Sequence, residues 1–182
     1  MTDEVTLIHQ LKETKSKEAA FRELISQYKE RLYWHIRKIV ISHDDADDVL
    51  QNTFIKVFKN IETFKGDSKL YSWMYRIATN ESITFINKRA KDRKVAISEI
   101  HSELAATLQS DVYFSGDEIQ LILQKAIATL PTKQQLVFNM KYFDELKYSQ
   151  MSEILSTSVG ALKASYFHAV KKIEKYIQQN NN

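Results

Sequence analysis

The amino-acid sequence predicts an all-α fold made of two small helical domains joined by a flexible linker. Apolar residues recur at helical spacing along most of the 182-residue chain. Only three glycines and one proline interrupt it, so tight turns are few. The helical pattern fades between about residues 93 and 117, where serines are scattered among weak hydrophobics. We therefore expect a first domain at 1–92, a linker at 93–117 and a second domain at 118–182.

The helices expected in the first domain have recognisable ends. Apolar patterns at 7–11 and 21–41 give the first helices. Ser42, with an aspartate three positions on, matches an S-x-x-D capping signature and starts a helix that runs to about Phe64. Gly66 ends this helix. The next helix then begins at a cap supplied by one of the two polar residues that follow the glycine, Asp67 or Ser68.

The second domain is expected to hold four helices. The first covers residues 117–130, and the next starts at Thr132, which with Gln135 matches a Thr-x-x-Gln capping box. The last two, at 148–155 and 158–177, close the chain. No internal repeat relates the two domains.

The stretch 148–167 has the plan of a helix-turn-helix. Ser158 can cap its second helix, whose apolar stripe faces inward. Small and cationic side chains are then exposed near the N-terminus of that helix: Gly160, Ala161, Lys163, Ala164 and Ser165. Small side chains let a helix enter a DNA major groove, and Lys163 can reach phosphate or guanine. The alternative is a plain helix bundle with a solvated lysine face.

Charge is unevenly distributed, although the formal net charge is only +3. Residues 42–52 carry four aspartates and no lysine or arginine, whereas residues 56–94 are basic on balance. A second basic cluster lies near the C-terminus: Lys163, Lys171, Lys172 and Lys175. Two separated basic surfaces predict a bound polyanion, and the acidic patch predicts a different partner.

Two features of the first domain favour contacts with other macromolecules. Opposite its apolar stripe, the helix from Ser42 presents Asp45, Asp48, Gln51, Asn52 and Ile55, and an isoleucine beside carboxylates favours protein docking over a merely solvated face. The segment 64–78 interleaves aromatic with basic residues, as opening a DNA duplex requires. Tyr71 and Tyr75 share a flanking face and are better candidates for base contact than Phe64 or Trp73, which fit a core role equally well.

Several function classes are disfavoured. The chain has no cysteine, so it has no disulfide or thiolate chemistry, and no glycine-rich loop for a nucleotide. Its five histidines lack metal-ligand spacing, and the acidic cluster lacks a calcium-loop pattern, so we expect no metal, cofactor or catalytic residue. No apolar run approaches the about 20 residues of a membrane span. The acidic N-terminus does not resemble a secretory signal, so we expect no membrane insertion and a cytoplasmic location.

At these motifs the chain resembles the extracytoplasmic-function sigma factors of bacterial RNA polymerase. Residues 45–58, Phe64-Lys-Gly-Asp-Ser68 and Trp73-Met-Tyr-Arg-Ile-Ala78 resemble the second conserved region of that family. Leu130-Pro131, Tyr142-Phe143 and Ser158-Val-Gly160 with Lys163 resemble the fourth region. The resemblance covers about residues 20–92 and 118–177, in the family's order and with its spacer.

The resemblance implies a role for each surface. The ridge at Asp45, Asp48, Gln51 and Ile55 falls where the family docks on the clamp helices of the polymerase's largest subunit. The loop Phe64, Lys65, Gly66, Asp67, Ser68 and Lys69 falls where a flipped base of the −10 element is captured. Residues on the helix that faces the melting strand are Tyr71, Trp73, Tyr75, Arg76, Asn80 and Lys88. Residues on the helix that reads the −35 element are Gly160, Ala161, Lys163, Ala164 and His168, after the cap Ser158.

The sequence departs from the family at some positions. Ser165, His168 and Val170 stand where arginine is frequent, so we expect −35 contacts that are either fewer or moved to Lys163, Lys171 and Lys172. Asn52 stands where an acid is common, which weakens docking slightly.

The resemblance implies a sigma factor that binds core RNA polymerase and promoter DNA, with an anti-sigma protein as a candidate further partner. It implies no enzyme, because nucleotide addition belongs to the polymerase. Three other readings stay open on the residues alone: an ordinary helix-turn-helix regulator, a structural or sequestering helical protein, and a helical hydrolase, for which no site is visible.

Overall fold

The computed structural model describes residues 3–107 and 118–180, and every regular element within these ranges is helical. The all-α prediction is therefore confirmed. The elements are α1 (Glu4–Lys12), α2 (Lys17–Val40), α3 (His43–Asn60), the 3-10 helix η1 (Ile61–Thr63), α4 (Leu70–Arg93), α5 (Ile97–Thr107), α6 (Glu118–Ala128), α7 (Thr132–Tyr142), α8 (Tyr148–Leu155) and α9 (Val159–Asn180). None of these helices is long and apolar enough to cross a membrane.

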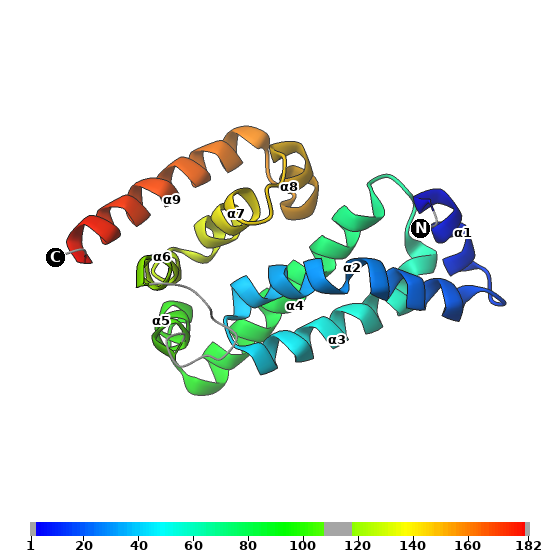
Figure 1. Cartoon of the computed structure of the whole chain (residues 1–182), viewed down its shortest axis with the longest axis horizontal. Coiled ribbons are helices and arrows are strands. Elements are labelled where there is room, and N and C mark those ends of the chain that lie inside the picture. The colour runs from blue at the N-terminus through cyan, green and yellow to red at the C-terminus, as the bar shows by residue number, and fades with distance from the viewer. Residues whose placement is uncertain (1–2, 108–117, 181–182) are drawn as a thin grey trace.

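The first domain is built on three long helices that pack against one another. Figure 1 shows α2, α3 and α4 side by side along the long axis of the molecule, with α1 at the end where α2 and α4 begin and α3 ends. The apolar stripe of α3 is buried between its neighbours, as its periodicity predicted: Ala46, Val49, Leu50, Phe54 and Val57. Leu32 and Ile36 of α2 and Met74 and Ala78 of α4 complete this core.

Helix starts in the first domain follow the prediction at one position and differ at another. Ser42 caps α3, because its Oγ accepts the Asp45 amide hydrogen at 3.4 Å. Neither Asp67 nor Ser68 caps α4: its N-cap is Lys69, which makes no side-chain cap bond. Instead the Leu70 amide donates to the carboxylate of Glu4 at 3.2 Å. This cap comes from a distant helix, so local sequence could not indicate it.

The second domain consists of α6 to α9, with α9 packed on α6, α7 and α8. Ser158 Oγ accepts the Ala161 amide hydrogen at 3.3 Å, so the predicted cap of the last helix is present. The predicted box at Thr132 is absent, because Pro131 is the N-cap and Thr132 is already the first helical residue. Ser156 takes the left-handed conformation (φ 49°) that closes α8 and turns the chain into α9.

Part of the predicted linker is helical. Helix α5 buries Ile100, His101 and Ala105, and it packs on α4 and α6. Weak hydrophobics that looked scattered in the sequence therefore share one helical face. Residues 108–117 of the predicted linker lie outside the described residues.

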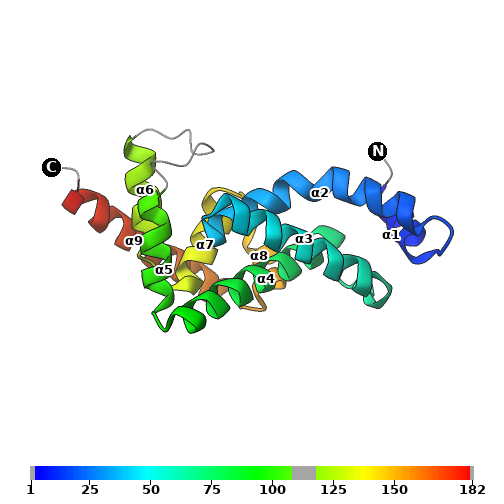
Figure 2. The same ribbon diagram turned by 90° about the horizontal axis from the view of Figure 1, so that it is seen from below.

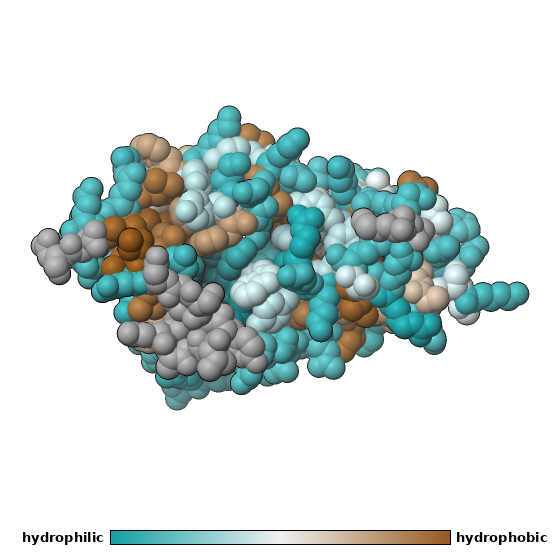
Figure 3. Space-filling view, in the orientation of Figure 1, coloured by the Kyte–Doolittle hydropathy of each residue, from teal (hydrophilic) through white to brown (hydrophobic). Residues whose placement is uncertain are grey.

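The two domains pack against each other, which the sequence did not predict. Helix α8 lies against α4, and α7 lies against α2 (Figures 1 and 2). Val137, Met140, Met151 and Ile154 belong to the same apolar cluster as the core of the first domain. Figure 3 shows a mostly hydrophilic face, with apolar colour gathered at the end that carries α6 and α9.

Polar contacts also cross the domain boundary. His35 Nδ1 donates to Asp144 Oδ2 at 3.0 Å, and Lys38 forms an ion pair with the other oxygen of the same carboxylate. The Asn139 side-chain amide donates to the backbone oxygen of Lys38 at 3.2 Å. His35 and Asp144 are almost completely buried, so these contacts are shielded from solvent.

Candidate nucleic-acid interface

The predicted docking ridge lies on the solvent-facing side of α3. Asp48, Gln51 and Asn52 are exposed, and Ile55 is 44 % exposed beside them. Asp45 differs, because it is half-buried and its carboxylate pairs with Arg89 of α4. Four of the five predicted residues therefore form one outward surface, while Asp45 also ties α3 to α4.

The loop at 64–69 connects η1 to α4 and is anchored at its start. Phe64 is buried, and its ring centroid lies 5.2 Å from that of the half-buried Trp73. Lys65, Gly66, Asp67 and Lys69 are exposed, and Ser68 is half-buried. Gly66 has φ +81°, a conformation that strains residues with a Cβ, although a Cβ there would meet nothing within 4 Å. The Phe64–Trp73 contact thus anchors a loop that exposes polar and cationic groups to solvent.

The two tyrosines expected to contact bases are buried in this structure. Tyr71 and Tyr75 are 8 % and 1 % exposed, and their ring centroids lie 5.0 Å apart. Burial raises the pKa of Tyr71 to about 12. The Tyr75 hydroxyl donates to the backbone oxygen of Arg31, whereas the Tyr71 hydroxyl has no hydrogen-bond partner among the described residues. The two tyrosines share one helix face, as their spacing predicted. That face is covered, so neither ring is available for stacking in this arrangement.

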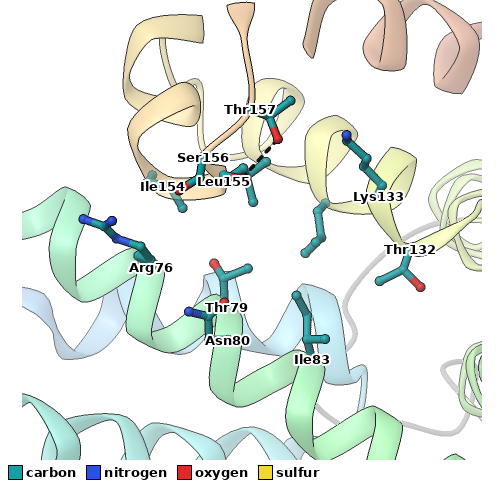
Figure 4. Close-up of a pocket in the computed structure, with 11 residues that line it drawn as sticks. Arg76, Thr79, Asn80, Ile83, Thr132, Lys133, Ile154, Leu155, Ser156 and Thr157 are labelled. Carbon is teal, nitrogen blue, oxygen red and sulfur yellow. Dashed lines mark hydrogen bonds between the residues drawn. The ribbon is translucent and has the colours of Figure 1, made fainter. Parts of the chain in front are cut away.

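The remaining predicted residues of α4 lie on more accessible faces. Arg76 is half-buried, and Asn80 and Lys88 are exposed. Arg76, Thr79, Asn80 and Ile83 line a cavity of about 560 Å³ between the domains. Figure 4 shows these side chains facing the segment Ile154–Thr157, which ends α8 and leads to α9, and the start of α7 at Thr132 and Lys133. One face of α4, the helix expected to contact the melting DNA strand, therefore meets the helix-turn-helix.

The predicted reading face of α9 is on the surface. Its members Ser158, Gly160, Ala161, Lys163, Ala164, His168 and Lys171 are all exposed. Leu162, Ala169 and Ile173 are buried on the opposite side, as the inward stripe required. The Lys163 ammonium lies 5.9 Å from the centroid of the Tyr148 ring, and Lys171 pairs with Glu174 at 3.0 Å on the surface. The N-terminal half of α9 therefore offers small side chains and a cation to a partner.

One residue of this face was missed from the sequence. Phe167 is 58 % exposed and lies one turn after Lys163 and Ala164. The signal was its register, because 160, 164, 167 and 171 follow one helical ridge.

Comparisons with known proteins assign both halves of the chain. Sigma-70 region 2 matches residues 24–92, and sigma-70 region 4 matches residues 120–173. A curated relative, the ECF RNA polymerase sigma factor SigW of Bacillus subtilis, is 31 % identical over 173 residues, which is 90 % of this chain and 92 % of the relative.

The chain belongs to the extracytoplasmic-function family of RNA polymerase sigma factors. The ECF RNA polymerase sigma-E factor of Haemophilus influenzae is 28 % identical over 167 residues, covering 87 % of this chain and 88 % of that protein. The predicted resemblance and function are confirmed: this is a sigma factor, which binds core polymerase and directs promoter-specific transcription initiation. The family assignment replaces the ordinary helix-turn-helix regulator and the structural or sequestering protein as readings of this chain.

Solved structures of similar fold agree with the two-domain architecture. CnrH, solved in complex with the cytosolic domain of CnrY, has a TM-score of 0.70 at 18 % identity, and the match covers 97 % of both chains. The sigma factor RpoE of Bartonella quintana, solved with the anti-sigma factor NepR, has a TM-score of 0.66 at 17 % identity, covering 87 % of this chain and 96 % of that one. The docking ridge, the loop and α4 all fall within sigma region 2, and the reading face of α9 falls within region 4.

Proposed function

We propose that the two domains divide promoter recognition between them. The first domain, residues 1–92, binds the clamp helices of the polymerase and opens the −10 element. The second, residues 118–182, reads the −35 element. The observation that carries this assignment is the exposed face of α9, which begins with Gly160 and Ala161 and continues with Lys163.

Reading of the −35 element rests on how α9 fits a major groove. The absence of bulk at Gly160, Ala161 and Ala164 lets the start of the helix approach the base edges closely. The amide groups of the first helical turn and the positive end of the helix dipole favour a phosphate. Lys163 adds a cation that reaches phosphate or guanine. Phe167 continues the same face with an apolar ring, which suits a thymine methyl group.

Opening of the −10 element rests on the loop and on α4. The exposed loop side chains Lys65, Asp67 and Lys69 offer two cations and a carboxylate to a flipped base. Arg76, Asn80 and Lys88 follow along α4 and attract the strand's phosphates. Contacts of this kind stabilise the open strand more than the closed duplex, so binding itself shifts DNA toward the melted state.

Simultaneous engagement of both elements requires the domains to separate. The −35 and −10 elements are about 25 base pairs apart, which at about 3.4 Å per base pair is roughly 85 Å of duplex. The turn that precedes α9 lies against α4 in this structure, so the two reading surfaces cannot span that distance here. Separation also uncovers the side of α4 that faces the second domain, where Arg76 and Asn80 lie.

Partners and location follow from the same assignment. The Bartonella relative of similar fold was solved with an anti-sigma factor, and we propose an anti-sigma protein as a further partner of this chain. We propose a cytoplasmic location, where its polymerase and DNA partners are. The chain needs no catalytic residue, metal or cofactor of its own, because the polymerase supplies nucleotide addition.

Tethered DNA cleavage tests the assignment of each surface to its element. The chain has no cysteine, so the single-cysteine variants Asp67→Cys and Ala161→Cys can each carry one cleavage reagent. In holoenzyme on promoter DNA, the first variant should cut near −10 and the second near −35. Glu118→Cys, at the exposed start of α6 and outside both surfaces, is the matched control. Cleavage of one element by both variants, or of neither, contradicts the assignment.

A further inference from the structure

Helix α1 makes two polar contacts with the loop at 64–69, one at each end of it. We propose that Glu4 and Lys12 are positioning residues that fix this loop in the shape that selects the flipped −10 base. The inference rests on the proposed role of the loop. It concerns residues outside the part that matches sigma region 2, which begins at residue 24.

The first contact holds the start of the loop. Lys12 Nζ donates to the backbone oxygen of Phe64 at 2.7 Å, and the pair is partly buried. Phe64 is where η1 ends and the loop begins. Its side chain is already fixed by burial and by Trp73, so Lys12 adds a restraint on the backbone rather than on the ring.

The second contact holds the end of the loop. The Leu70 amide donates to Glu4 Oε1 at 3.2 Å, and Leu70 is the first residue of α4. Helix starts leave amide hydrogens without partners, and a carboxylate there also complements the helix dipole. Asp67 and Ser68 could have supplied this cap from within the loop. Because Glu4 supplies it, their polar groups stay available at the loop surface.

Helix α1 is capped at its start and packed into the core, so it can hold the two ends of the loop at a fixed separation. Asp3 caps it by accepting the Val5 and Thr6 amide hydrogens at 3.0 and 3.1 Å. Leu7 and Leu11 are 1 % and 0 % exposed in the core of the first domain. Glu4 and Lys12 are eight residues apart, a rise of about 12 Å along a helix. One short helix therefore reaches both ends of the loop.

The consequence is a loop with fixed ends and an exposed middle. Ordering a flexible loop upon binding costs affinity, and holding it in the bound shape beforehand reduces that cost. A fixed pocket also rejects bases that do not match it, whereas a mobile loop adapts to several. Loss of the two contacts should therefore lower base selectivity at the −10 element more than it lowers binding to core polymerase.

The test compares Lys12→Met and Glu4→Ala with their conservative counterparts in full-length holoenzyme. The readout is initiation from promoters that differ only in the flipped −10 base, expressed as the ratio between the preferred and the other bases. We expect each disruptive variant to lower this ratio roughly threefold to tenfold. Lys12→Arg keeps a donor and Glu4→Gln keeps an acceptor, so both should restore most of the wild-type ratio. Lys15→Met and Glu18→Ala change the same charges at exposed neighbouring positions and should leave it unchanged.

The outcomes separate this inference from the proposed function of the loop. If the wild-type chain initiates but shows no preference at any −10 base, the proposed role of the loop fails and the inference falls with it. If the wild-type chain discriminates while folded Lys12→Met and Glu4→Ala do so equally well, only the inference is overturned. Equal loss in the conservative variants would also overturn it, because keeping the donor or acceptor would then fail to preserve base selectivity.

Discussion

His35 of α2 and Asp144, between α7 and α8, form a buried hydrogen-bonded pair that joins the two domains, with Nδ1 and Oδ2 3.0 Å apart. The other ring nitrogen lies 2.8 Å from the hydroxyl oxygen of Thr79 on α4. Asp144 also pairs with Lys38, so a single carboxylate receives two side chains of the first domain. The side of α4 that carries Arg76 and Asn80 faces the second domain next to this pair, so the contact limits access to part of the proposed DNA-binding surface.

Replacing Asp144 should loosen the docking of the domains. Asp144→Asn removes the charge that compensates Lys38 and leaves a weaker acceptor for His35, which should destabilise the docked arrangement by about 1–3 kcal/mol. The measurement is energy transfer between dyes on Glu30→Cys in α2 and Glu153→Cys in α8, two exposed positions on opposite sides of the domain contact. We expect lower transfer efficiency in the free variant. Asp92→Asn is the matched control, and transfer that is equal in Asp144→Asn and wild type would contradict a structural role for the pair.

Acid should weaken the same contact. Burial raises the pKa of Asp144, but the hydrogen bond and charge of His35 and then the charge of Lys38 lower it further, so its pKa lies below the usual 3.8. A carboxyl group with a depressed pKa stabilises the docked state above that usual value, and this stabilisation disappears as pH falls through the lower pKa. Energy transfer should therefore hold at neutral pH and fall only below about pH 4 in the wild type. Asp144→Asn should lack this transition, and an identical acid transition in both proteins would contradict the assignment to Asp144.

Removal of the Lys163 cation should weaken binding to the −35 duplex. Lys163→Ala loses one phosphate or guanine contact, which corresponds to about 1 kcal/mol or roughly fivefold in affinity. If the contact is to phosphate, the slope of log affinity against log salt concentration should also fall by about one. The measurement is a holoenzyme titration at several salt concentrations. Lys15→Ala controls for loss of a distant charge, and unchanged affinity of Lys163→Ala would place the reading face elsewhere.

Charge reversal on α3 should weaken assembly with core polymerase. Asp48 is exposed beside Ile55 on the proposed docking surface, so Asp48→Arg introduces a repulsive charge and should lower affinity about tenfold or more. Competition with a labelled sigma factor for core enzyme measures this directly. Asp92→Arg makes the same charge change at an exposed position of α4 outside that surface. Equal affinity of the two variants would show that α3 does not dock there.

The sequence predicted features that depend on local pattern. The buried stripe of α3 with its Ser42 cap, and the exposed face of α9 with its Ser158 cap, both follow from helical spacing and capping chemistry, which act within a few residues. Two of the sigma-factor motifs, residues 45–58 and Ser158-Val-Gly160 with Lys163, lie on these elements, so the family was recognisable as well.

Features that depend on distant parts of the chain could not be predicted. Tyr71 and Tyr75 have the spacing of a contact face, but spacing does not reveal what packs on it. The cap of α4 comes from Glu4, 66 residues away, and the domain contact joins residues 109 apart. Contacts at such separations are set by the packed tertiary structure, and no local pattern encodes them.

Transcription with purified components shows whether this chain directs core polymerase to promoters. Core RNA polymerase is incubated with fragments of genomic DNA, with and without the chain, and the RNA start sites are mapped. We expect new RNA start sites only when the chain is present, each preceded by one shared sequence near −10 and another near −35. An absence of new starts, or starts without these two shared sequences, would contradict it.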